Sequence, residues 1–142
     1  MPRAGMVHAL EKIHSLLKID GCLIDIHPTP EPAALMVRVG ERLTPAGWLD
    51  EVTDYAEYEW ADEALSAATA SNLFALDRRS AFEFVWHAES VPDLLAYLAE
   101  DWQDARLDAV TAVRIDEMLK TPEHDKEILV KEAIRIARYR RL

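Results

Sequence analysis

A junction between a helix and a strand, at residues 16–28, constrains the fold of this chain more than any other stretch. Apolar residues recur at helical spacing as far as Leu17, and Gly21 follows where a left-handed residue can end a helix. From Cys22 the sequence reads Cys-Leu-Ile-Asp-Ile-His, which predicts a strand at 22–27. Because this run is almost continuously apolar, we expect it to be covered on both faces and the Cys22 thiol to be buried.

The rest of the chain alternates between helical and strand periodicity, with short connections. The patterns predict helices at about 6–18, 51–71, 90–102 and 105–120, and strands at 34–39, 42–49, 73–76, 81–88 and 126–139, with a turn at 77–80. The last segment also fits a helix, but its β-branched residues favour a strand. Ser90 is placed as an N-cap, and Pro45 with Gly47 favours an edge strand or a bulge.

This order of elements predicts an α+β fold in a single domain over residues 1–142. We expect a mixed, largely antiparallel sheet of five or six strands, with about four helices packed mainly on one face. Half of the 142 residues are hydrophobic, which is enough for a core without cross-links. The single cysteine cannot form an internal disulfide.

Charge and hydropathy narrow the classes of function. The net charge of −10 argues against nucleic-acid binding, because phosphate contacts need clustered Lys and Arg. No apolar run reaches the ~20 residues that cross a bilayer, and the N-terminus lacks the order of a signal peptide. We therefore expect a cytoplasmic protein with neither nucleic acid nor membrane as a partner.

The charge is also uneven along the chain. Residues 50–63 are rich in Asp and Glu and contain no basic residue, whereas residues 126–141 are rich in Lys and Arg. These stretches either form two solvated faces or form patches that meet within one chain or between two. The second alternative makes a homodimer, or another protein partner, an expectation.

The candidate site residues are Asp25, His27 and His87. Asp25 and His27 are the only closely spaced carboxylate–histidine pair on one face of a predicted strand, where they could hold a metal or position a base. His87 lies near the end of another predicted strand and joins them if the two strands are neighbours. The alternative is a local hydrogen bond between Asp25 and His27 at a strand end. No histidines have the spacing of a known metal site, so we expect no metal.

The junction belongs to a longer run, residues 9–26, that resembles a late segment of class I S-adenosylmethionine-dependent methyltransferases. In that family a helix ends in a Leu-Lys-Pro-Gly-Gly-like turn before a central strand, and here Ile19-Asp20-Gly21 replaces Pro-Gly-Gly. The family binds its cofactor at a glycine-rich loop after the first strand. The four glycines here form no G-x-G pattern, and no predicted strand precedes Gly5. The resemblance therefore implies a C-terminal half-domain, and we expect no cofactor.

Two functions fit these observations. The first is a non-catalytic, methyltransferase-like binding or interaction module that pairs through a sheet edge or through its charged patches. The second is a small-molecule enzyme or ligand-binding protein with a pocket near Asp25 and His27. The missing glycine-rich loop favours the first.

Overall fold

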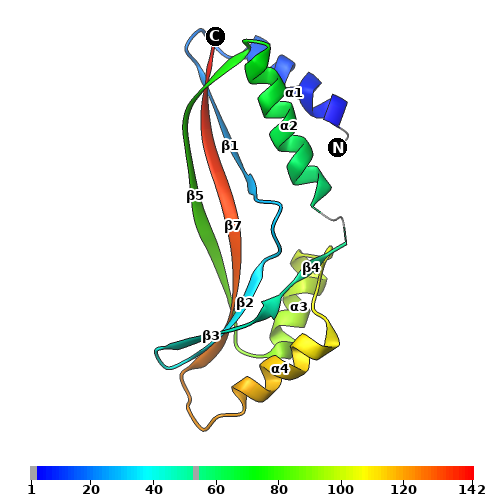
Figure 1. Ribbon diagram of the computed structural model, residues 1–142, viewed down its shortest axis with the longest axis vertical. Coiled ribbons are helices and arrows are strands. Elements are labelled where there is room, and N and C mark those ends of the chain that lie inside the picture. The colour runs from blue at the N-terminus through cyan, green and yellow to red at the C-terminus, as the bar shows by residue number, and fades with distance from the viewer. Residues whose placement is uncertain (1–2, 53–54) are drawn as a thin grey trace. The chain divides into compact units, whose positions relative to one another are not determined.

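The computed structural model describes residues 3–52 and 55–142, apart from the side chain of Arg3 (Figure 1). Over these residues the chain forms four helices and seven strands. In order they are α1 (Arg3–Leu16), β1 (Cys22–Pro28), β2 (Ala34–Val39), β3 (Arg42–Trp48), β4 (Asp50–Glu51), α2 (Ala56–Ala70), β5 (Phe74–Ala88), α3 (Val91–Asp101), β6 (Ala105–Arg106), α4 (Ala109–Leu119) and β7 (Lys126–Arg141). None of these helices is both long and apolar enough to cross a membrane.

The described strands form one five-stranded sheet and one two-stranded sheet. In the larger sheet β7 pairs with β1, β2 and β5, and β3 continues from β2. The registers of β1 and β2 on β7, and of β3 on β2, are antiparallel, as is that of β4 on β6. The predicted α+β fold with a largely antiparallel sheet is therefore confirmed.

The chain divides into two compact units, each built from separate stretches of sequence. Unit 1 comprises Met1–Pro30, Tyr55–Phe82 and Ala133–Leu142, and unit 2 comprises Glu31–Asp54 and Glu83–Glu132. Strands β5 and β7 each contribute residues to both units. Neither unit is a continuous segment, and the single domain over residues 1–142 stays a prediction.

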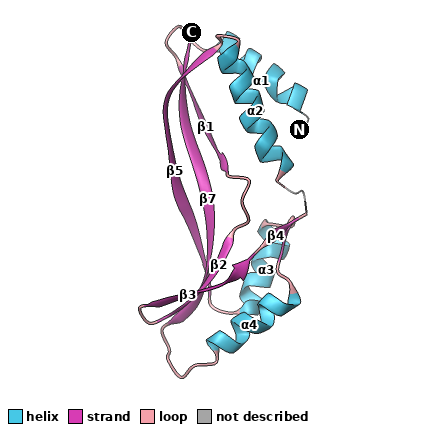
Figure 2. Cartoon of the chain, viewed as in Figure 1, coloured by secondary structure: helices cyan, strands magenta, loops and turns pink. Residues whose placement is uncertain are grey.

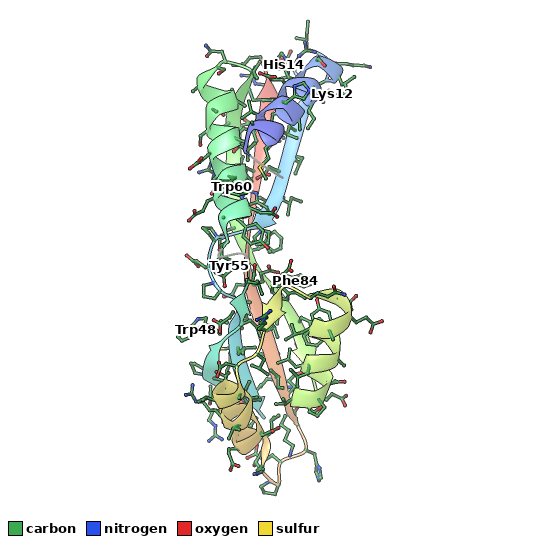
Figure 3. All side chains as sticks on the ribbon, turned by 90° about the vertical axis from the view of Figure 1, so that its right-hand side faces the viewer. Lys12, His14, Trp48, Tyr55, Trp60 and Phe84 are labelled. Atoms are coloured by element: carbon green, nitrogen blue, oxygen red, sulfur yellow. The ribbon has the colours of Figure 1, made fainter. Side chains whose placement is uncertain are left out.

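Unit 1 has two layers, with α1 and α2 side by side against one face of its part of the sheet (Figure 1 and Figure 3). Its buried residues come from both helices and from β5 and β7: Leu10, Ala64, Leu65, Ala68, Phe74, Ala137 and Tyr139. Ala137 and Tyr139 lie two positions apart in β7 and so share the face that the helices cover. The opposite face of this sheet carries no described helix (Figure 1).

Strand β1 forms as predicted, but only one of its faces is covered. Asp25 and His27 lie on the half-buried face, whereas Ile24 and Ile26 are 51% and 58% exposed. Cys22 is exposed as well. The predicted two-sided cover and buried thiol are therefore wrong, because both described helices of unit 1 lie on the same side of the sheet.

Helix α1 is followed by a different left-handed residue from the one predicted. Asp20 has the positive φ, 59°, whereas Gly21 donates its N–H to the carbonyl oxygen of Lys18 at 2.8 Å. A Cβ at position 21 would lie only 2.7 Å from that oxygen. Gly21 is therefore required for close approach of the backbone rather than for a left-handed turn.

Unit 2 builds a second core from β2, β3, the first half of β7, α3 and α4. Three alternating residues of β2, which confirms the strand predicted at 34–39, are almost fully buried: Leu35, Val37 and Val39. The register of β3 on β2 skips Ala46, which is the bulge expected between Pro45 and Gly47. Ser90 caps α3 as predicted, its Oγ accepting the N–H of Asp93 at 3.2 Å.

The long strands differ in how well the sequence predicts them. Strand β7 confirms the strand expected at 126–139 and extends it to Arg141. Strand β5 runs unbroken from Phe74 to Ala88 (Figure 2), so the turn predicted at 77–80 is wrong. Strand β5 pairs with β7, and this pairing outweighs the local turn preference of the polar residues at 77–80.

Two helices begin later than predicted, because short strands precede them. Asp50–Glu51 form β4, and α2 begins only at Ala56; the predicted helical residues 53–54 lie outside the described residues. Ala105–Arg106 form β6, which pairs with β4. Helix α4 then begins after Asp108, whose carboxylate accepts the N–H of the third helical residue.

Candidate functional site

Asp25 and His27 are neighbours on the half-buried face of β1, as their spacing predicts. Their side chains are 18% and 12% exposed, and Asp25 Oδ2 lies 2.9 Å from His27 Nδ1. The two groups do not reach hydrogen-bond geometry, so both atoms are buried without a hydrogen-bond partner among the described residues. Their contact is therefore a close approach of the imidazole and the carboxylate, and the local hydrogen bond considered as an alternative is not formed.

The other ring nitrogen of His27 contacts one residue of α2 and one of β7. His27 Nε2 lies 3.2 Å from Asp62 Oδ1 and 2.9 Å from Arg135 Nη2. Arg135 also forms an ion pair with the Asp62 carboxylate. The register explains the contact between His27 and Arg135, because the two residues are directly opposite each other in the β1–β7 pair. We call these four residues, Asp25, His27, Asp62 and Arg135, the polar cluster.

Sequence reasoning found two members of the polar cluster and missed Asp62 and Arg135. Asp62 precedes the buried Leu65 by three positions, so helical spacing places it on the covered face of α2. Arg135 has the same strand parity as the buried Ala137. These spacings become informative only once the covered faces and the register of β7 on β1 are known.

The polar cluster links three elements of unit 1. His27 has a carboxylate at each ring nitrogen, and its ring is almost enclosed. A general base needs a nitrogen that can reach a substrate, and here Asp62 and Arg135 occupy the nitrogen that Asp25 leaves free. Among the described residues, no three His, Cys, Asp or Glu side chains are placed to hold a metal ion. Such a network holds β1, β7 and α2 together and makes the loss of any one charge costly.

Asp25 also lines a groove of about 410 Å³ in unit 1. The lining comes from α1, β1 and α2: Met6, Ala9, Leu10, Ile13, Leu23, Ile24, Asp25, Ile26, Ala61, Ala64 and Leu65. Residues 23–26 are consecutive in β1, and successive side chains of a strand point to opposite faces. The groove therefore follows the edge of β1 beside α1, and we call it the edge groove.

The uncovered face of the unit 1 sheet is apolar at its centre. Ile26 lies opposite Ile136 across the β1–β7 pair, and a surface hollow of about 260 Å³ lies beside them. We call this surface the outer face; its residues are Ile24, Ile26, Arg78, Ser80, Ile136 and Arg138. Arg138 donates a hydrogen bond to Asp77 at 2.5 Å. The outer face therefore combines exposed isoleucines with an ionic rim.

His87 lies in unit 2 and has partners of its own there. Its Nδ1 is 3.1 Å from Glu127 Oε2, and its side chain is 56% exposed. Glu127 forms a second ion pair with Arg38, directly opposite it on β2, at 2.8 Å. Arg38 in turn lies 2.9 Å from Asp125. The structure brings Asp25 and His27 together. His87 is not a member of the polar cluster; it contacts Glu127, which in turn pairs with Arg38.

The charges of these ion-paired residues in unit 2 stabilise one another. Side-chain hydrogen bonds with Asp125 and Glu127 raise the pKa of Arg38 above its ordinary value. The bond from Arg38 lowers the pKa of Asp125. Burial by itself would raise the pKa of Glu127, but hydrogen bonds from Arg38 and His87 outweigh it and lower that pKa. Both carboxylates are therefore ionised at neutral pH.

Comparison with known proteins adds no family to this description. The chain matches no protein-family model, no curated protein and no solved structure.

Proposed function

We propose that this chain is a non-catalytic interaction module, related to the C-terminal half of a methyltransferase-like domain, that pairs with a second copy through the outer face. The observation that carries the proposal is the exposure of Ile24 and Ile26 on a sheet face that no described helix covers. Contiguous apolar surface of this kind marks interaction sites, because its burial removes it from water.

The outer face suits a second copy because its rim carries both signs of charge. Arg138 pairs with Asp77, and Arg140 lies 3.4 Å from Asp20. A two-fold axis through the isoleucines would let each arginine meet an acid of the other copy, which is the self-complementarity of a symmetric dimer. Two sheets packed in this way lie ~10 Å apart, as in a β-sandwich.

Light scattering after size-exclusion chromatography tests the dimer. We expect twice the chain mass of 16.1 kDa at both low and high salt, because the centre of the contact is apolar. In the Ile136→Glu variant, the new carboxylate can pair with the arginines of the hollow in a monomer but would be buried in a dimer, so we expect a monomer. Val113→Glu, at a residue of α4 that is 62% exposed, is the matched control and stays dimeric. A native chain that is monomeric at both salt concentrations rules the proposal out.

The relation to methyltransferases rests on the order helix, Gly21, strand at residues 9–26. It predicts a domain without the cofactor-binding half, because Gly5 lies in α1 and the four glycines form no G-x-G pattern. Isothermal calorimetry with S-adenosylmethionine is expected to show no binding. Tight one-to-one binding contradicts this part of the proposal.

A small-molecule enzyme or ligand-binding protein with its pocket near Asp25 and His27 is the second candidate. It is favoured by the edge groove, which Asp25 lines and whose volume falls within the range of small-molecule sites. Catalysis is the weaker part of this candidate, since His27 is engaged at both nitrogens. Asp25 and the apolar lining of the groove support binding instead.

A further inference from the structure

Strand β1 has a free edge. Its only strand neighbour among the described residues is β7. The N–H of Thr29 bonds to the carbonyl of Ala133, and the N–H of Arg141 bonds to the carbonyl of Gly21. Both pairs continue the register of β1 on β7, so the odd-numbered residues of β1 bond to β7. In an antiparallel pair, the residues between them point their N–H and C=O groups away from the partner strand.

The residues that present backbone groups at this edge are Cys22, Ile24 and Ile26. The next in the row, Pro28, has no N–H and so ends the series of donors. The edge groove runs along the same stretch and is lined by β1, α1 and α2. An unpaired row of backbone groups beside an apolar groove is the arrangement in which proteins add an extended peptide as a further strand.

We propose that β1 accepts an extended segment of a different protein as an added antiparallel strand. This segment carries a Lys or Arg opposite Asp25, with apolar residues opposite Ile24 and Ile26. The inference uses the edge of β1 rather than the outer face, and it therefore goes beyond the proposed dimer.

The preference for a basic residue follows from Asp25. Among the described residues that line the edge groove, Asp25 is the only charged one. Its Oδ2 is turned inward, 2.9 Å from His27 Nδ1, and its side chain is 18% exposed. A strand added to β1 places one side chain directly opposite Asp25, with the two Cβ atoms ~5 Å apart. The ammonium or guanidinium group of that side chain can pair with the Asp25 carboxylate. The net charge of −10 also attracts a cationic segment.

The rest of the groove matches the stem of a long basic side chain. Ala9, Leu10 and Ile13 of α1 line it beside β1. A Lys or Arg stem packs against such apolar surface while its charged end reaches a carboxylate. The flanking residues of the peptide point to the other face, next to Ile24 and Ile26, where β-branched apolar residues pair well across strands.

A second copy of this chain is a poor occupant of the edge. When two β1 strands pair antiparallel through these edge groups, an odd-numbered residue lies opposite Asp25. Near the centre of the strand that residue is Leu23, Asp25 or His27. None of them is Lys or Arg, and His27 already belongs to the polar cluster. The basic residue must therefore come from another protein.

Fluorescence anisotropy with synthetic peptides tests the inference on the unmodified protein. The probe is a fluorescein-labelled peptide with a central Val-Lys-Val between Gly-Ser flanks, and its matched control has Val-Glu-Val. Methylating both valine nitrogens removes the donors that face β1, whereas methylating the lysine nitrogen alters a group that faces away. We expect the Val-Lys-Val and N-methyl-lysine peptides to bind, the Val-Glu-Val peptide to bind at least about tenfold more weakly, and the N-methyl-valine peptide not to bind.

Protein variants test the role of Asp25. Asp25→Asn should bring the affinities for Val-Lys-Val and Val-Glu-Val to within about threefold of each other. Asp62→Asn, which also alters the polar cluster but does not line the groove, should keep the preference for lysine. Three results would each overturn the inference: Val-Lys-Val does not bind, the two N-methylated peptides bind equally, or the protein shows no preference for lysine over glutamate. The monomeric Ile136→Glu variant should bind the peptide normally, so loss of the dimer and loss of peptide binding are separate results.

Discussion

Replacing Arg135 by Met tests whether the polar cluster stabilises unit 1. Arg135 lies between the side chains of His27 and Asp62, and it is the only guanidinium in the cluster. Met keeps most of the apolar stem and removes the charge. The carboxylate of Asp62 would then be left beside the imidazole of His27, with no cation from β7.

The burial of the polar cluster determines how much free energy of unfolding the Arg135→Met variant is expected to lose. Removing one partner of a fully buried ion pair costs 3–5 kcal/mol, whereas exposed pairs contribute about 0–1 kcal/mol. Arg135 and Asp62 are 18% and 31% exposed, which lies between these limits and nearer the buried one. We therefore expect Arg135→Met to lower the free energy of unfolding by about 2 kcal/mol.

Urea denaturation followed by far-ultraviolet circular dichroism measures this loss. Lys120→Met is the matched control, because Lys120 forms an ion pair with Glu117 in which the two side chains are 67% and 62% exposed. That variant should change the free energy of unfolding by less than about 0.5 kcal/mol. If Arg135→Met costs no more than Lys120→Met, the cluster does not stabilise the fold and the reasoning is refuted.

Two further predictions concern the pH dependence of stability in unit 2. Asp125 and Glu127 have lowered pKa values in the folded chain, so their contribution is present above their ordinary values of 3.8 and 4.5 and is lost as pH falls further. Arg38→Gln should therefore lower the urea midpoint at pH 7 and make the midpoint fall less steeply with pH below about pH 4.5. The prediction is contradicted if the midpoint of the variant falls with pH as steeply as that of the native chain. Burial raises the pKa of Glu132, so its ionised form opposes folding and stability is lost as pH rises through the folded pKa. Glu132→Gln should raise the thermal midpoint at pH 7 and have little effect below the ordinary value of 4.5; a lower midpoint at pH 7 would contradict the sign.

Several elements of this fold follow from local sequence alone. The alternation of Leu35, Val37 and Val39 identifies β2 and places these residues on one face, because the side-chain period of a strand is two. The structure buries that face. Ser90 marks the start of α3, since its hydroxyl satisfies an N–H that the helix leaves unpaired. The β-branched residues of 126–139 identify β7, the longest strand.

Other elements depend on partners that are distant in sequence. The polar residues at 77–80 favour a turn, yet this stretch continues β5, a strand that pairs with β7. Glu51 is predicted as the start of a helix, yet it lies in β4 and pairs with Ala105 of β6. A local pattern cannot anticipate a backbone partner that arrives from far along the chain, and for that reason these predictions were wrong.

The candidate site shows the same division. Sequence by itself determined that Asp25 and His27 share a face of β1, because residues two apart in a strand always do. Only the tertiary structure decided that Asp62 and Arg135 join them, because the register of β7 and the packing of α2 bring those charges to the same place. It also decided that Ile24 and Ile26 face outward. An apolar run indicates that its burial is favourable, but it does not indicate which of its faces the helices will cover.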